Sequence, residues 1–225
     1  MLRPAFFWLF SGSVLASGPA MAVEGFYLKG FGGIAFVQDA SLGILDDPDF
    51  SFRYDYDPGY VLGAAAGLQV TGRLAVEAEA SYRQAHADVH AKLDDRSPEE
   101  PIYDTWQFGE TVKARSLMLN LRYSFDPVAM GPVSADAGGR LRPYVGAGLG
   151  GTVLDFGDDS TDPHLAWQLF AGLSYDLGQA WSLFGEARWF KTDGGTIHQD
   201  PSDGSDWLQG SFESIDMLFG VSYRF

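Results

Sequence analysis

The sequence predicts an all-β protein, an eight-stranded antiparallel up-and-down barrel whose strands cross a membrane. Three observations support this fold class. Apolar and polar residues alternate with a period of two along eight segments. Tight turns and long polar loops alternate between these segments, and aromatic residues gather at the two ends of the apolar faces.

The first 22 residues have the pattern of a secretory signal peptide. The basic residue Arg3 precedes an apolar stretch over 5–15, and Ala20-Met21-Ala22 forms a small-residue cleavage site. A membrane anchor is the alternative, but a span needs about 20 apolar residues and serine and glycine interrupt this stretch. We therefore expect residues 1–22 to direct export and residues 23–225 to form the barrel domain.

The predicted strands follow from the alternation. In the fourth segment, Leu117, Leu119 and Leu121 share one face, while Asn120 and Arg122 lie on the other. A strict two-residue period over this length is a strand signal, and strands longer than 10 residues suit tilted membrane crossings. The predicted strands are 25–38, 60–71, 74–86, 111–125, 142–154, 165–177, 181–191 and 212–225.

The connections differ at the two ends of the predicted strands. Residues 71–73 and 178–180 are tight turns, and 126–141 is a longer link rich in Gly, Ala and Pro. At the other end we expect polar loops, namely 39–59, 87–110, 157–163 and 192–211. Short periplasmic turns and long external loops are typical of membrane barrels.

Aromatic residues indicate that the apolar face meets lipid. They form two bands with Leu, Val, Ala and Gly between them, as expected for girdles at two membrane interfaces. A soluble lipocalin-like barrel, with its apolar face inside, is the alternative. The band at the turns comprises Phe26, Tyr123, Phe125, Tyr175, Trp181, Tyr223 and Phe225, and the band at the loops comprises Tyr60, Tyr82, Trp167 and Trp189.

Charged residues on the polar face are balanced, in a chain with 30 acidic against 15 basic residues and a net charge of −15. Because an unpaired buried charge is costly, this balance predicts an ion-pair network inside the barrel. The network either fills the lumen as a structural core, since eight strands leave room only for side chains, or gates a narrow conductance. Its predicted members are Lys29, Glu77, Glu79, Arg83, Arg122, Asp176, Glu186, Arg188 and Asp216.

The remaining charges carry weaker signals. Acidity argues against a nucleic-acid partner, and the absence of cysteine excludes disulfides and thiolate metal sites. Most acidic residues belong to the predicted loops, where they either repel one another in water or weakly bind divalent ions. Lys113, Arg115 and Lys191 are expected to point outward above the loop-end aromatic band, where they either contact lipopolysaccharide phosphates or extend into water.

We predict neither a metal site nor a cofactor nor a catalytic group. Four histidines, His86, His90, His164 and His198, fall in or beside the predicted loops, and only the first two have a spacing that occurs in metal sites. Nucleophilic catalysis requires a base beside a serine and an acid that orients the base. The sequence shows no convincing arrangement of this kind.

Several features together resemble the small Gram-negative outer-membrane β-barrel proteins, including opacity and porin-family surface antigens and the barrel domain of outer membrane protein A. They are the leader, the eight strands, the segment Arg-Pro-Tyr-Val-Gly-Ala-Gly-Leu-Gly at 142–150 and the terminal Ser-Tyr-Arg-Phe. The resemblance implies an outer-membrane location and a terminal strand that the assembly machinery recognises. The residues of this signal are Phe219, Val221, Tyr223 and Phe225.

The resemblance also implies a role. We expect a non-enzymatic protein that supports the envelope and interacts with host or surface ligands through acidic external loops. A narrow porin-like channel for small solutes, gated by the lumen ion pairs, is the first alternative. A lipid-modifying outer-membrane enzyme is the second.

Overall fold

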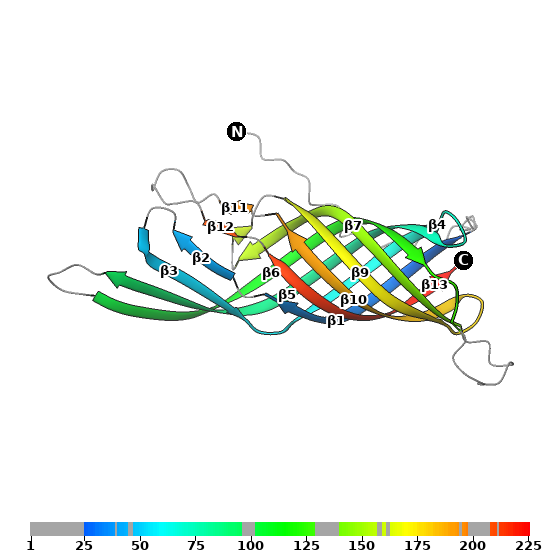
Figure 1. Cartoon of the computed structure of the whole chain (residues 1–225), viewed down its shortest axis with the longest axis horizontal. Coiled ribbons are helices and arrows are strands. Elements are labelled where there is room, and N and C mark those ends of the chain that lie inside the picture. Colours follow the sequence, from blue (N-terminus) through cyan, green and yellow to red (C-terminus); the bar gives the residue numbers. More distant parts are fainter. Residues whose placement is uncertain are drawn as a thin grey trace.

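The computed structural model describes residues 25–38, 40–44, 47–95, 102–128, 140–156, 159–160, 163–193, 195–197, 208–210 and 212–225. The predicted signal peptide lies outside these residues. Within them, we find no helix that is long and apolar enough to cross a membrane. The barrel strands (Figure 1) are β1 (Phe26–Val37), β4 (Gly59–Gln69), β5 (Leu74–Asp95), β6 (Ile102–Ser124), β7 (Leu141–Phe156), β9 (His164–Asp176), β10 (Trp181–Thr192) and β13 (Glu213–Arg224).

Each barrel strand pairs antiparallel with its neighbours in chain order. The last strand, β13, pairs with β1, where Tyr27 lies opposite Arg224, and this pairing closes the cylinder. The predicted eight-stranded up-and-down barrel is therefore confirmed. The start of β1 and the end of β13 lie at the same end of the barrel as the turn at 70–73 (Figure 1). We call this the turn end, and the opposite end the loop end.

The predicted loops were wrong in part, because strand pairing continues beyond the barrel. Instead of a loop over 87–110, β5 and β6 run for 22 and 23 residues and stay paired as far as Asp95 and Ile102. The added strands are β2 (Ala40–Ile44), β3 (Asp47–Tyr56), β8 (Asp159–Ser160), β11 (Gly195–Ile197) and β12 (Leu208–Gly210). In the sequence, the period of two continues past the predicted end of β5, because Ala87, Val89, Ala91 and Leu93 alternate with polar residues, and the sequence analysis missed this signal.

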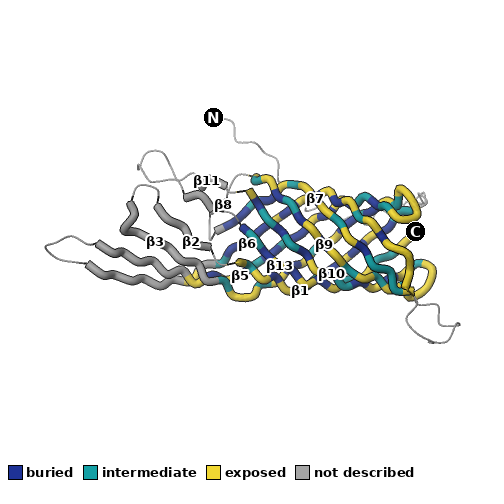
Figure 2. Tube along the Cα trace, in the orientation of Figure 1, coloured by how far each residue is buried: buried dark blue, intermediate teal, exposed yellow. Residues whose placement is uncertain are grey.

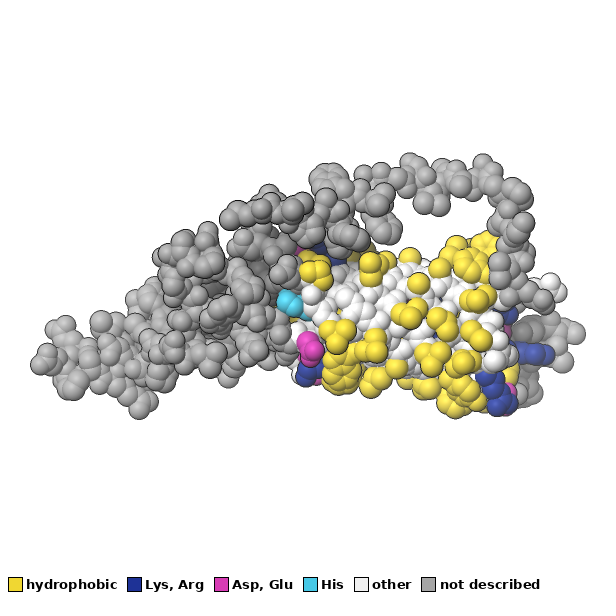
Figure 3. Space-filling view, turned by 90° about the horizontal axis from the view of Figure 1, so that it is seen from above, with side chains coloured by type: hydrophobic (Ala, Val, Ile, Leu, Met, Phe, Trp, Pro, Cys, Tyr) yellow, Lys and Arg dark blue, Asp and Glu magenta, His cyan; other side chains and the backbone are white. Residues whose placement is uncertain are grey.

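Side chains alternate between the inside and the outside of the barrel, as Figure 2 shows by alternating buried and exposed residues. Leu117, Leu119 and Leu121 point outward with 54%, 62% and 51% of their surface exposed. Figure 3 shows hydrophobic side chains over the barrel wall and charged ones near its ends. The apolar face therefore points outward, and the lipocalin-like alternative is wrong.

The outward aromatic residues contact one another at both ends of the barrel wall. At the loop end, the rings of Trp167 and Trp189 are 4.6 Å apart between centroids. At the turn end, Tyr223 packs 4.8 Å from Trp181 and 4.9 Å from Phe225. These contacts turn single aromatic residues into bands that link neighbouring strands.

Candidate functional site

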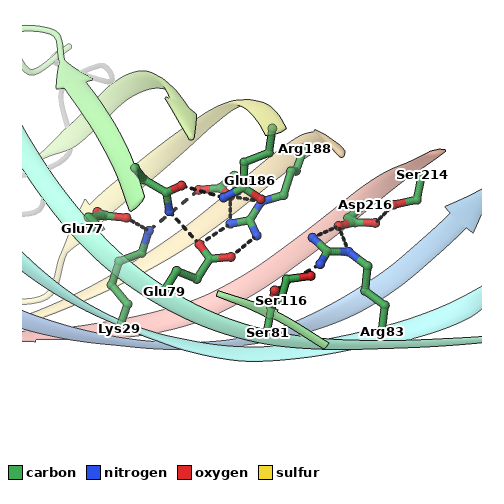
Figure 4. A network of polar contacts seen from close by, with 12 residues as sticks. Lys29, Glu77, Glu79, Ser81, Arg83, Ser116, Glu186, Arg188, Ser214 and Asp216 are labelled. Atoms are coloured by element: carbon green, nitrogen blue, oxygen red, sulfur yellow. Dashed lines mark hydrogen bonds and ion pairs between the residues drawn. The ribbon is translucent and has the colours of Figure 1, made fainter. Parts of the chain in front are cut away.

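The centre of the lumen holds a buried cluster of ion pairs around Arg188 (Figure 4). Its guanidinium donates to Glu79 on β5, with 3.0 Å between Nη2 and Oε2, and to Glu186 on its own strand, with 2.7 Å between Nη2 and Oε1. These side chains are at most 1% exposed. Strands β5 and β10 lie on opposite sides of the closed sheet, so the pair between Arg188 and Glu79 bridges the lumen.

Further polar groups extend this cluster toward the turn end. Lys29 Nζ lies 3.2 Å from Glu77 Oε2 and 3.8 Å from Glu186 Oε2. Arg122 Nε lies 3.4 Å from Glu77 Oε1. Hydroxyl and amide groups donate further hydrogen bonds to the acceptors of this cluster. Tyr27 donates to Glu77, Tyr144 to Glu186, Asn120 to Glu79 and Gln168 to Asn120.

A second buried ion pair lies toward the loop end. Arg83 on β5 donates to Asp216 on β13 over 2.9 Å, and Ser214 donates to the other carboxylate oxygen. The guanidinium carbon of Arg83 is 3.9 Å from the centre of the Phe190 ring. The structure thus places Arg83 and Asp216 in one pair, joined across two strands that are not neighbours in the sheet.

Asp176 lies apart from the predicted network. Its carboxylate accepts a hydrogen bond from Ser182 over 2.8 Å at the turn end. Among the described residues it takes part in no ion pair, because it lies closer to the turn end than Glu77 and lines a separate cavity. The expectation that Asp176 joins the other members is corrected in this respect.

Aromatic rings, which the sequence analysis missed, share the lumen with the charges. The Phe184 ring centre lies 4.6 Å from Lys29 Nζ, and the Phe31 ring centre lies 5.2 Å from the Arg188 guanidinium carbon. Such contacts stabilise a buried cation through the ring face. The signal was present in the alternation, since these rings occupy the same face as the charges. The inward rings are Tyr27, Phe31, Tyr144, Phe170, Phe184 and Phe190.

The loop end of the lumen is partly apolar, although Thr152, Thr192 and Ser214 are also buried there, and the prediction of a polar interior is wrong in part. Inward-pointing apolar side chains form a buried cluster above Arg83. The alternation over 111–125 predicts a polar inward face, but three of its inward positions carry a valine, an alanine and a methionine. The cluster comprises Val112, Ala114, Met118, Leu154, Ala166, Phe190 and Phe212.

Sequence and structure comparisons agree with this geometry. The sequence profile described as "Outer membrane protein beta-barrel domain" matches residues 6–225, almost the whole chain. The chain belongs to this family. An outer-membrane barrel of this kind lies in the outer membrane of Gram-negative bacteria, with lipid against the exposed apolar face. No curated protein sequence matches this chain.

Three solved structures illustrate the shared fold. Neisserial surface protein A has 15% sequence identity and a TM-score of 0.53, over 90% of this chain and 98% of that chain. OprG from Pseudomonas aeruginosa has 16% identity and a TM-score of 0.55, over 90% and 96%. The outer membrane protein AlkL has 21% identity and a TM-score of 0.50, over 95% and 96%. Identities this low show the outer-membrane barrel fold alone.

The three outward basic residues lie at the loop-end rim of this outer-membrane barrel. Arg115 Nη2 is 2.6 Å from Asp155 Oδ2, and Lys191 Nζ is 2.9 Å from Glu213 Oε2. Lys113 lies directly across from Asp155 in the β6–β7 ladder. The positive charges of Arg115 and Lys191 are therefore shared with carboxylates.

The predicted assembly residues lie on the outer face of β13 and, for Phe225, directly after its end. Phe219 is 73% exposed, and Val221 and Phe225 are also exposed. Tyr223 is half-buried between Trp181 and Phe225. All four point away from the lumen network.

The structure describes only part of the histidines and acidic loop residues. Among the described residues, no three His, Asp or Glu side chains lie close enough together to hold a metal ion. His86 Nδ1 lies 3.4 Å from Thr111 Oγ1 on the neighbouring strand, and His164 begins β9. The side chains of His90 and His198, and most of the acidic loop residues, lie outside the described part of the chain.

Proposed function

We propose that this outer-membrane barrel is a non-enzymatic anchor with a closed lumen, and that it acts at the cell surface through the acidic segments at its loop end. The observation that carries the proposal is the link from Glu79 on β5 to Arg188 on the opposite strand β10. Buried charges with several partners each, packed among aromatic rings, fill an eight-stranded interior as a core. This arrangement favours a rigid support over a channel.

The loop end supports the surface role. Strands β5 and β6 continue well past the barrel, and β3 adds to the edge of this extension through its pairing with β5 (Figure 1). The extended segments 39–59 and 87–110 are rich in acidic residues. A projecting, negatively charged sheet of this kind suits host or surface ligands that carry positive charge.

Planar-bilayer recording tests the closed lumen. We expect the purified protein to give no steady openings, and Arg188→Ala to create them because it removes the residue that bridges the lumen. Arg115→Ala, which removes an outward arginine, is the control and stays silent. Steady openings of the unmodified protein that disappear in Glu186→Ala or Arg122→Ala would instead support a narrow channel for small solutes.

A second measurement tests the non-enzymatic assignment. The purified barrel is incubated with lipopolysaccharide and with phospholipid, and the acyl chains are analysed by mass spectrometry. We expect the acyl chains to stay unchanged. Loss or transfer of an acyl chain would contradict the proposal and identify a lipid-modifying enzyme.

We also propose two partners within the membrane. Lys113, Arg115 and Lys191 lie at the rim where lipopolysaccharide phosphates are found, and basic side chains bind phosphate through charge-assisted hydrogen bonds. We expect the outer-membrane assembly machinery to recognise the outward residues Phe219, Val221 and Tyr223 on β13 and Phe225 directly after it. Their position on the wall of the barrel, away from the lumen, supports recognition over a structural role in the core.

A further inference from the structure

The turn end of the lumen contains a small polar cavity with more positive than negative charge. Its volume is about 30 Å³. Three arginines, Arg122, Arg142 and Arg224, contribute to its wall, and Asp176 is the acidic residue among the described residues that line it. Serine hydroxyls from several strands occupy the rest of the wall. The cavity lies at the end of the barrel opposite the segments that carry the proposed surface role.

The positive charges of this cavity are incompletely neutralised. Arg122 shares Glu77 with Lys29, and Asp176 accepts a hydrogen bond from Ser182. Neither Arg142 nor Arg224 forms a side-chain ion pair with another residue in the described part of the chain. One carboxylate therefore faces two arginines that have no acidic partner of their own.

One buried donor at the same place has no acceptor, and a second is poorly aligned with its partner. The Nε–H group of Arg142 is shielded from solvent and lacks a hydrogen-bond partner among the described atoms, and that of Arg122 lies 3.4 Å from Glu77 Oε1 without forming a hydrogen bond. A buried donor without an acceptor costs about 1–3 kcal/mol, and more when the donor is charged. Unsatisfied buried groups in proteins commonly mark a water or ion that completes them. An acceptor bound in the cavity would remove this cost.

The chemistry of the wall selects the ligand. Guanidinium groups donate hydrogen bonds and cannot accept them, and they match the geometry of oxyanions. The hydroxyls of Ser174 and Ser222 lie in the same wall and supply further donors. The enclosed volume of about 30 Å³ has room for one or two water-sized groups, and Arg224 is exposed at the mouth of the cavity. A small oxyanion therefore enters with an oxygen against the guanidinium groups while the rest of it stays at the mouth, whereas a cation is repelled by the arginines.

We propose that the turn-end cavity binds a small free oxyanion such as inorganic phosphate, held chiefly by Arg142 and Arg224. The bound anion neutralises the surplus charge at the periplasmic mouth of the lumen and thereby stabilises the barrel. Because strands from most of the barrel circumference enclose the cavity, the anion comes from solution and not from a lipid headgroup.

Thermal unfolding of the full chain in neutral detergent micelles tests this inference. Sodium phosphate is titrated against sodium chloride at constant ionic strength. A ligand that binds only the folded state raises the unfolding temperature with its concentration. We expect phosphate to raise it in the unmodified protein and to have no such effect in Arg142→Gln and Arg224→Gln. Broadening of the ³¹P NMR signal of phosphate should be lost in the same variants.

Arg73→Gln is the matched control. Arg73 lies at the same end of the barrel, but it is exposed and paired with Asp126. A hydrogen bond to the Tyr123 hydroxyl and the charge of Asp126 raise the pKa of its guanidinium. This variant should keep the full phosphate response. Should Arg142→Gln fail to fold, Arg224→Gln, whose residue is exposed at the mouth, carries the test.

Two results would overturn the proposal. They are the absence of a phosphate effect in the unmodified protein and an equal loss of that effect in Arg73→Gln. Phosphatidylglycerol added to the micelles without phosphate should change the unfolding temperature of the unmodified protein and of the variants by the same amount. A lipid response that depends on Arg142 would contradict the assignment to a free anion.

Discussion

Gly67 on β4 lies directly across from Tyr27 on β1, and a Cβ atom on Gly67 would lie only 2.2 Å from the tyrosine ring. The ring lies over the bare backbone, and its hydroxyl reaches Glu77 over 2.6 Å. The same relationship recurs between directly paired residues around the lumen. The other pairs are Phe31 with Gly63, Tyr144 with Gly172, Phe170 with Gly146, and Phe184 with Gly220.

Gly67→Ala should destabilise the barrel by about 1–3 kcal/mol, the usual cost of overpacking a core. The added methyl group collides with Tyr27, which cannot move freely because it is buried and bonded to Glu77. Urea unfolding in phospholipid vesicles measures the change. Gly30→Ala is the control, since a Cβ atom there meets nothing within 4 Å. Equal stability of the two variants would show that the ring does not need the glycine.

Arg188→Gln should destabilise the protein by about 3–5 kcal/mol, because it leaves buried carboxylates without their cation. Glu79 and Glu186 both face this guanidinium and are almost fully buried. Adding Glu79→Gln to the variant should recover part of the loss. The free energy of unfolding is measured by denaturant titration in the same vesicles.

Arg115→Gln serves as the comparison for the lumen arginine. Its pair with Asp155 lies on the outer rim, and the Arg115 side chain is 48% exposed. Exposed ion pairs contribute little to stability, so the change should be small. A loss of stability as large as that of Arg188→Gln would mean that the buried ion pairs of the lumen stabilise the barrel no more than an exposed pair does.

The period of two was sufficient to predict the barrel strands and the face that carries the charges. Most predicted strand ends agree with the structure to within one or two residues, and Glu79 and Arg188 both lie inside as expected. Which charges pair was not predictable. Arg83 reaches Asp216 across 133 positions in the chain, and this contact depends on the tilt of strands around a closed cylinder.

Two further features escaped the sequence analysis for different reasons. The extension of β5 continues the alternation, with Ala87, Val89, Ala91 and Leu93 at every second position, but its charged residues favoured the interpretation of a polar loop. The inward rings, such as Phe31 and Phe184, do follow the alternation, but an apolar residue on the charged face was not interpreted as lumen. Glycine directly across a strand pair, as at Gly63 and Gly220, is the signal that identifies such rings.

Phe225→Ala should lower the amount of folded protein in the outer membrane several-fold, because it removes the terminal aromatic residue of the proposed assembly signal. Folding of the purified chain into detergent micelles should change little. Phe125→Ala is the matched control, since both phenylalanines are outward, at the turn end and 46% exposed. Heat-modifiable mobility on gels reports the folded fraction in both settings.

The two settings separate recognition from stability. A defect of Phe225→Ala in cells and in micelles alike would assign the residue a structural role, through its contacts with Phe26 and Tyr223. A defect of the same size in Phe125→Ala would show that any aromatic residue of the turn-end band is needed. Either result would contradict the assembly signal.

Leu119→Arg tests the lipid-facing surface. Leu119 lies midway along the part of β6 between Arg115 at the rim and Tyr123 in the turn-end band, and it is 62% exposed. An arginine at the centre of the lipid-facing wall costs about 2–4 kcal/mol, whereas the cost near the interface falls to about 0–1 kcal/mol. Leu165→Arg, at the loop-end start of β9, is therefore the control.

Unfolding in vesicles should show the large loss of stability for Leu119→Arg alone. In lipid-free detergent with a thin apolar layer, the difference between the two variants should shrink. Equal losses at both depths would mean that the wall does not follow the thickness of a bilayer, and the membrane-spanning position of these strands would have to be revised.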